Sequence, residues 1–204
     1  MGQTSLKPSA LLINGRIPIE WAPIWAMMGA RAAIALFLCC DSMDALMGQS
    51  SCLGARPVAL FARAYQEGTA CPPTAAELLT LNTWIESEFK AIPCAVKFWT
   101  GEISLAECKA EFRKSATLNV STAHNQHPYL SKSANAKFRA IHDWQHIILS
   151  ADDSFNGEFS TWWNNNAPDS IQWILFSEIV LQAAAAIHTG KFPAQKLVKY
   201  SDFI

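Results

Sequence analysis

Residues 168–190 read PDSIQWILFSEIVLQAAAAIHTG, and this segment has the features of one long buried helix. Proline is favoured in the first turn of a helix, as at Pro168, and glycine just beyond its end, as at Gly190. Between these ends, apolar residues occur on both sides of the helix, which indicates burial over most of its surface. The segment therefore predicts a compact domain built around a central helix.

Helix signals also dominate the preceding hundred residues. Capping boxes at 74–77 (TAAE) and 104–107 (SLAE) each predict the start of a helix, because the first and fourth residues of such a box satisfy each other's backbone N–H groups. We further expect a helix over 135–149 and a weaker one from about Glu158 to Asn164. The helices over 135–149 and 168–189 are expected to pack against each other.

Strand signals are few. Residues 95–99 and 117–121 alternate between apolar and polar side chains, which predicts two short strands of a small ribbon. The expected fold class is therefore mainly α, or α+β with a minor two-stranded ribbon, in a compact helical domain with two central buried helices.

The length of the chain favours one domain. Its 204 residues are enough to bury a sizeable core, and no segment resembles an interdomain linker. We expect a single domain over 1–204, with 75–190 as the core that carries the motifs and 1–70 as a candidate N-terminal helical elaboration.

Composition excludes several classes of partner. The net charge is -1 and no stretch is dense in lysine or arginine, so nucleic acid is not expected as a partner. The most apolar segment, 21–40, contains Pro23 and Arg31 and leaves an unbroken apolar run shorter than the ~20 residues of a membrane span. We expect a buried helix there and no membrane partner.

The cysteines favour a reducing compartment. All six precede the histidine-rich region and none forms a Cys-x-x-Cys pair, which excludes a zinc ribbon. The N-terminus does not resemble a signal peptide, and so large and apolar a chain does not need disulfides. The expected location is the cytoplasm, and the redox state of the cysteines stays open.

A pair of histidines is the strongest chemical signal. In the stretch FRAIHDWQH over 138–146, His142 and His146 are four residues apart and therefore lie on one face of a helix. Two imidazoles at this spacing with an intervening acid are typical of a divalent-metal site. The alternative is two separate core histidines, each hydrogen-bonded to a carbonyl. In the metal interpretation Asp143 acts as general base, or it orients a ligating histidine by a hydrogen bond.

Glu178 is the candidate third ligand. Helical projection places Glu178 and Gln182 in the centre of an otherwise apolar face, where a carboxylate needs compensation by a metal or a charged hydrogen bond. Gln182, one turn further on, would orient the carboxylate or a substrate. The alternative is that this face is not the buried one.

Two further residues are weaker candidates. Glu158 follows a Phe-Asn-Gly turn and would be a fourth ligand, a proton carrier, or only a charge at a helix N-terminus. His127 lies in a polar loop before the histidine helix and would approach the site, or stay on the surface.

The chain resembles a family of uncharacterised proteins encoded by tailed bacteriophages. The resemblance rests on the order of His127-Pro128, the segment 138–143 (FRAIHD) with a following histidine, Gly157-Glu158, and Glu178-x-x-x-Gln182, within roughly residues 76–185. In that family the second histidine follows the aspartate by four residues, whereas here it follows by three. The resemblance implies a shared polar site, to which it adds Arg139, and a phage or prophage origin in a bacterial host cytoplasm.

Together these residues favour a metal-dependent hydrolase of unknown substrate, in which His142, His146 and Glu178 hold the ion. Zinc is the first choice of metal, with iron or manganese as alternatives. Two histidines and one carboxylate also suit a non-haem iron enzyme with oxidative chemistry. A different class of function is a phage-encoded interaction protein that binds a host or phage protein and uses the polar cluster only structurally. The expected partner is accordingly a small-molecule or peptide substrate, or such a protein.

Overall fold

The computed structural model of the chain describes residues 55–199. The buried helix expected over 21–40 lies outside these residues. In chain order the elements are α2 (Ala55–Glu67), α3 (Ala75–Ala91), β1 (Ala95–Trp99), α4 (Leu105–Ser115), β2 (Thr117–Ser121), α5 (Lys132–Ile148), α6 (Phe155–Trp163), α7 (Asp169–Leu175), the π-helical segment η3 (Phe176–Leu181) and α8 (Gln182–Thr189). The fold is therefore mainly α with a minor sheet, as expected.

Both capping boxes form. Thr74 and Ser104 each accept a hydrogen bond from the backbone N–H of the glutamate three residues later, and each glutamate accepts one in return. These contacts fix the starts of α3 and α4 because they satisfy N–H groups that a helix leaves without an internal partner.

The two strands have the bounds expected from the sequence and pair in parallel, with Ala95 opposite Thr117 and Trp99 opposite Ser121. Parallel pairing needs a crossover connection, and α4 provides it. β2 is the more buried strand and packs on both α4 and α5, so the small sheet supports one end of the histidine helix.

The long C-terminal helix runs without interruption from Asp169 to Thr189 through α7, η3 and α8. It ends at Gly190, whose φ of 68° lies in the left-handed region that favours glycine. Its central turn, Phe176–Leu181, is π-helical, and this widened turn contains Glu178. Such bulges are frequent at functional sites.

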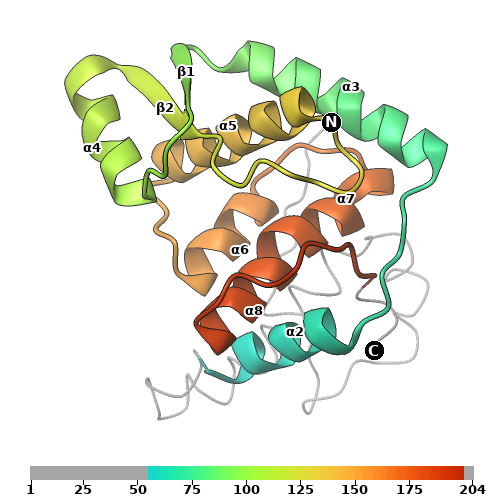
Figure 1. The fold of residues 1–204 in the computed structure, drawn as a ribbon. Helices are drawn as coiled ribbons and strands as arrows, with labels where there is room; N and C mark the ends of the chain where they lie inside the picture. The colour runs from blue at the N-terminus through green and yellow to red at the C-terminus, as the bar shows by residue number, and fades with distance from the viewer. Residues whose placement is uncertain (1–54, 200–204) are drawn as a thin grey trace, which may run out of the picture. The chain divides into compact units, whose positions relative to one another are not determined.

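The arrangement of the two central helices differs in part from the expectation. α5 packs mainly on α3, β2 and α6, whereas the long helix packs mainly on α2 and α6 (Figure 1). α6 therefore contacts both. The two helices face each other across a pocket, which both line, so direct packing between them is slight.

Within the described residues, Asp169–Thr189 is the helix long and apolar enough to cross a membrane. Its most apolar stretch of 18 residues is 67% buried inside the protein, as in a core helix.

Candidate metal site

Helix α5 brings the two histidines together. Nε2 of His142 lies 3.1 Å from Nε2 of His146, with the two rings at a steep angle. The side chain of His146 is almost fully buried, and that of His142 is 21% exposed. The pair expected from the i, i+4 spacing therefore forms, with the two Nε2 atoms next to each other.

The other ring nitrogen of His146 fixes the ring. Nδ1 lies 3.1 Å from the carbonyl oxygen of Ala151 and must donate to it, because a carbonyl oxygen only accepts. In the neutral ring the proton is then on Nδ1, which leaves a lone pair on Nε2. The same carbonyl accepts a hydrogen bond from Lys109 Nζ of α4. A ring held through Nδ1 by a carbonyl is typical of a metal-binding histidine.

Glu158 completes the cluster. Its carboxylate lies 3.0 Å from Nε2 of His142 and 3.4 Å from Nε2 of His146. Ser154 caps α6 by accepting from the N–H of Gly157, so that Glu158 follows in the first helical turn. The sequence predicted a flexible turn at 155–157, but these residues are helical.

Gly157 makes this placement sterically feasible. A Cβ atom on Gly157 would lie 2.0 Å from the carbonyl oxygen of Asp152, so only glycine allows the loop to approach α6 so closely. The loop in question also carries Ala151, the partner of His146. Gly157 therefore allows the Glu158 side chain and the Ala151 carbonyl to lie beside the two histidines at the same time.

The electrostatics of the cluster favour a positive charge. Burial acts to raise the pKa of Glu158, but the two histidines outweigh it and lower that pKa to about 2. Burial likewise acts to lower the pKa of His142, and the Glu158 carboxylate outweighs it and leaves the pKa raised. Glu158 is therefore an anion that attracts either a proton on His142 or a metal ion.

Geometry fits a tetrahedral ion. The ligand atoms of His142, His146 and Glu158 all lie within 4.8 Å of one another. A tetrahedral zinc ion with ligand distances of about 2.0–2.1 Å has ligand-to-ligand edges of about 3.3 Å. The separation of the two Nε2 atoms, 3.1 Å, is near this value. Glu158 approaches them with different oxygens, Oε2 at 3.0 Å from His142 and Oε1 at 3.4 Å from His146.

A hydrogen-bonded cluster of neutral rings would fit less well. With the proton of His146 on Nδ1, only Nε2 of His142 can supply a proton to the three contacts within the cluster. The contact between Nε2 of His146 and the Glu158 carboxylate would then place two hydrogen-bond acceptors side by side. In addition, Nδ1 of His142 is buried without a hydrogen-bond partner, so a doubly protonated ring would have an unsatisfied N–H group.

The cluster opens onto a pocket of about 720 Å³. The pocket is lined by His142 and Glu158 on one side and by Glu178, Gln182 and Gln195 on another. A metal site with three protein ligands beside a cavity leaves a coordination position for water or substrate, which distinguishes catalytic from structural zinc sites.

Asp143 and Arg139 also line this pocket. Burial raises the pKa of Asp143, although His142 and Arg139 oppose the shift. A carboxylate with a raised pKa beside this cluster has the properties of a general base. Arg139 donates from Nη1 to the carbonyl oxygen of Ala123, at 2.7 Å, which anchors its guanidinium at the pocket wall.

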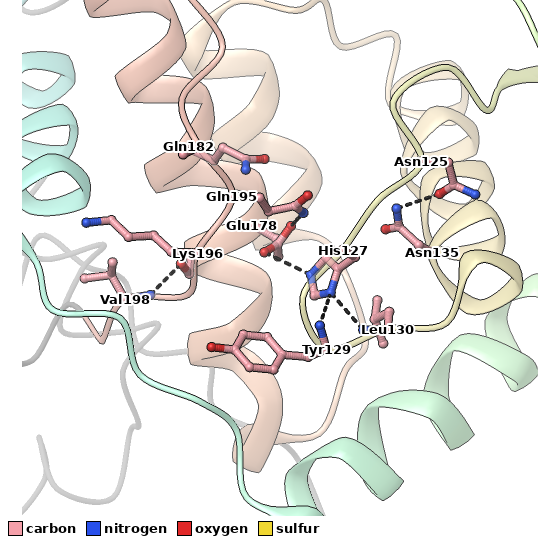
Figure 2. Close-up of polar contacts among 12 residues, drawn as sticks. Asn125, His127, Tyr129, Leu130, Asn135, Glu178, Gln182, Gln195, Lys196 and Val198 are labelled. Atoms are coloured by element: carbon pink, nitrogen blue, oxygen red, sulfur yellow. Dashed lines mark hydrogen bonds and ion pairs between the residues drawn. The ribbon is translucent and has the colours of Figure 1, made fainter.

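Glu178, the candidate third ligand from the sequence, lies in a different cluster. Its Oε1 is 3.2 Å from Nε2 of His127, and its Oε2 accepts a 2.8 Å hydrogen bond from Gln195 (Figure 2). Glu158 takes the place beside the two histidines instead. Projection of a regular helix correctly placed Glu178 at a polar point of a buried face, but it could not identify which element lies opposite.

His127 is buried rather than on the surface, with a side chain that is 0% exposed. Its Nδ1 accepts hydrogen bonds from the backbone N–H groups of Tyr129 and Leu130, at 3.0 Å and 2.9 Å. The proton of the neutral ring is therefore on Nε2, on the side of Glu178. His127 lies against Glu178 and is not among the residues that line the pocket.

Gln182 is the last of the expected site residues. It lines the pocket with Glu178 and donates from Nε2 to the hydroxyl of Tyr65, at 3.3 Å. Two residues near the site were not expected from the sequence: Gln195, which donates to Glu178, and Lys109, which contacts the Ala151 carbonyl. Neither lies in a motif with a recognisable spacing, so the sequence contains no signal for them.

No family model matches the chain, and neither the curated proteins nor the solved structures include a match to it. The resemblance to phage proteins therefore stays a sequence-based expectation.

Proposed function

We propose that the protein is a metal-dependent hydrolase in which His142, His146 and Glu158 hold one zinc ion. The observation that carries the proposal is the set of three ligand atoms within 4.8 Å of one another at the wall of a 720 Å³ pocket. Two histidines and one glutamate are a known ligand set of catalytic zinc, and an ion held by these three residues would activate water for hydrolysis.

The residues around the cluster have roles in this proposal. Asp143 accepts the proton of the attacking water, for which its raised pKa is suited. Arg139, whose guanidinium is held at the wall, stabilises the negative charge that develops on the substrate oxygen. The wall formed by Glu178 and Gln182 binds the part of the substrate that does not react.

A second candidate has the same ligands. Two histidines and one carboxylate also bind iron in non-haem oxygenases, which leave several coordination positions open. The open pocket is compatible with this chemistry too. Metal identity separates the two functions, because zinc does not change oxidation state and an iron oxygenase consumes oxygen.

We further propose that the protein works in the cytoplasm of a bacterial host. Cys71, Cys94 and Cys108, the cysteines within the described residues, are all free thiols, as a reducing compartment requires.

The test combines elemental analysis with an activity screen. Protein purified without added metal should contain about one equivalent of zinc, and chelation should remove it together with any turnover. The screen covers peptide, ester, phosphoester and nucleotide substrates, with zinc supplied and withdrawn. Iron in place of zinc, with oxygen consumption, would favour the oxidative candidate. Failure of the site to bind any divalent ion would reject both and leave the interaction protein.

A further inference from the structure

The wall of the pocket that contains Glu178 has a chemistry of its own. Glu178 belongs to the π-helical turn, and its side chain is only 6% exposed. A carboxylate buried to this degree is costly unless hydrogen bonds or an opposite charge compensate it. The groups around the Glu178 carboxylate therefore indicate which kind of ligand this wall of the pocket can bind.

The described part of the chain surrounds Glu178 with hydrogen-bonding groups rather than with a lysine or arginine. Within residues 55–199, no lysine or arginine forms an ion pair with Glu178, and its neighbours are Gln195 and His127. Nδ1 of His127 accepts two backbone hydrogen bonds, which leaves Nε2 as the ring nitrogen that faces Glu178. Oε1 of Glu178 has no aligned hydrogen bond, although Nε2 of His127 lies 3.2 Å away.

The amides beside Glu178 add acceptors. Gln182 uses Nε2 to donate to Tyr65, and Gln195 uses Nε2 to donate to Glu178. In each case the amide oxygen remains to accept a hydrogen bond from another group. One carboxylate and two amide oxygens match the three donors of an ammonium group.

The net charge of the whole pocket also favours a cationic ligand. Glu102, Asp143, Glu158 and Glu178 line it, against Arg139 as the one lysine or arginine among its lining residues. These four carboxylates exceed the combined charge of one arginine and one divalent ion. A partly enclosed pocket with a net negative charge attracts ligands of the opposite sign.

We propose that the pocket binds a substrate with a protonated amino group, and that this group contacts Glu178 and the oxygens of Gln182 and Gln195. The inference rests on the proposed function in taking the pocket as the substrate site, and it adds the substrate class. The hydrolysed bond lies at the His142–Glu158 cluster, and the ammonium group lies at the wall opposite.

Two matched probes test this. N-acetyl-lysine amide and N-acetyl-norleucine amide differ by the terminal ammonium group, and ligand-observed NMR measures the dissociation constant of each. Wild-type protein should bind the lysine probe about tenfold more tightly, as expected for a charged hydrogen-bonded contact. Equal binding of the two probes by the wild type would overturn the inference without reference to any variant.

Two variants locate the contact. Glu178→Gln keeps the shape of the side chain and should abolish the preference for lysine. Glu102→Gln removes the same charge from a side chain that is 81% exposed, and it should change the preference less than twofold because solvent screens that charge. Equal losses in both variants would mean that the overall charge of the pocket is responsible, and would overturn the assignment to Glu178.

Zinc content is measured on the same samples. A wild type with zinc and no lysine preference would contradict this inference alone. A wild type without zinc that still prefers the lysine probe would contradict the proposed hydrolase and support the ammonium site.

Discussion

Nε2 of His142 lies 3.1 Å from Nε2 of His146, a distance that fits either an N–H···N hydrogen bond between the two rings or a cation between their lone pairs. Glu158 approaches both atoms and supplies a negative charge, which favours the cation. We therefore expect His142→Ala, His146→Ala and Glu158→Gln each to abolish stoichiometric metal binding, as measured by elemental analysis after dialysis.

Two control variants belong to this experiment. His188 is an exposed residue of α8, and Glu178 lies in the other cluster, so His188→Ala and Glu178→Gln should both retain the ion. Loss of the metal in Glu178→Gln with retention in Glu158→Gln would restore the ligand set expected from the sequence alone.

Asp143→Asn tests the general base. This change keeps the shape of the side chain and removes its basic carboxylate, so the variant should retain fold and metal and lose about 10²–10⁴ in hydrolytic rate. A loss of metal affinity of about 10–100-fold with little direct effect on rate would instead assign Asp143 to the orientation of a ligating histidine.

The local parts of the fold could be predicted from sequence. The capping boxes of α3 and α4, the two strands and Gly190 at the end of the long helix depend on short segments, whose signals lie in adjacent residues. The i, i+4 histidine pair was predictable for the same reason.

Contacts between distant elements could not be predicted. Glu158 was treated as the residue after a turn because the cap of α6 by Ser154 lacks the glutamate of a capping box. Glu178 was expected to share a metal site with His142 and His146. Projection of one helix does not show that the loop with His127 packs against Glu178 instead. The π-helical turn changes the register of the long helix, and no pattern in its apolar residues reveals it.

The pH dependence of the metal-free protein follows from Glu158. Because the pKa of His142 is raised above 6.5, its proton stabilises the metal-free fold below that pH, and this contribution is lost as the pH rises through the higher folded value. The contribution of Glu158, with a pKa of about 2, is present above its ordinary 4.5 and is lost as the pH falls towards 2.

NMR titration of the His142 ring in chelator-treated protein measures this directly. The midpoint should lie above 6.5, and Glu158→Gln should lower it because the variant removes the carboxylate. Metal must displace the same proton, so zinc affinity should rise about tenfold per pH unit until the pH passes that midpoint. A midpoint unchanged by Glu158→Gln would show that the carboxylate does not act on His142.

Gly157→Ala tests whether the close approach of loop and helix supports the site. The new Cβ would lie 2.0 Å from the carbonyl oxygen of Asp152, so the loop or α6 must move. We expect a loss of about 1–3 kcal/mol in the free energy of unfolding, as for an overpacked site. Zinc affinity should fall as well, because Glu158 is the next residue and the loop carries the Ala151 carbonyl that orients His146.

Gly190→Ala is the matched control for this change. At Gly190 a Cβ meets no atom within 4 Å, but the φ of 68° is unfavourable for alanine and should cost about 1–2 kcal/mol. The two variants are thus expected to lose similar stability, and only Gly157→Ala is expected to lose zinc affinity. Because stability is matched, a fall in zinc affinity in both would indicate general loosening of the fold. A fall in neither would show that Glu158 keeps its position when the loop moves, and that the glycine serves packing alone.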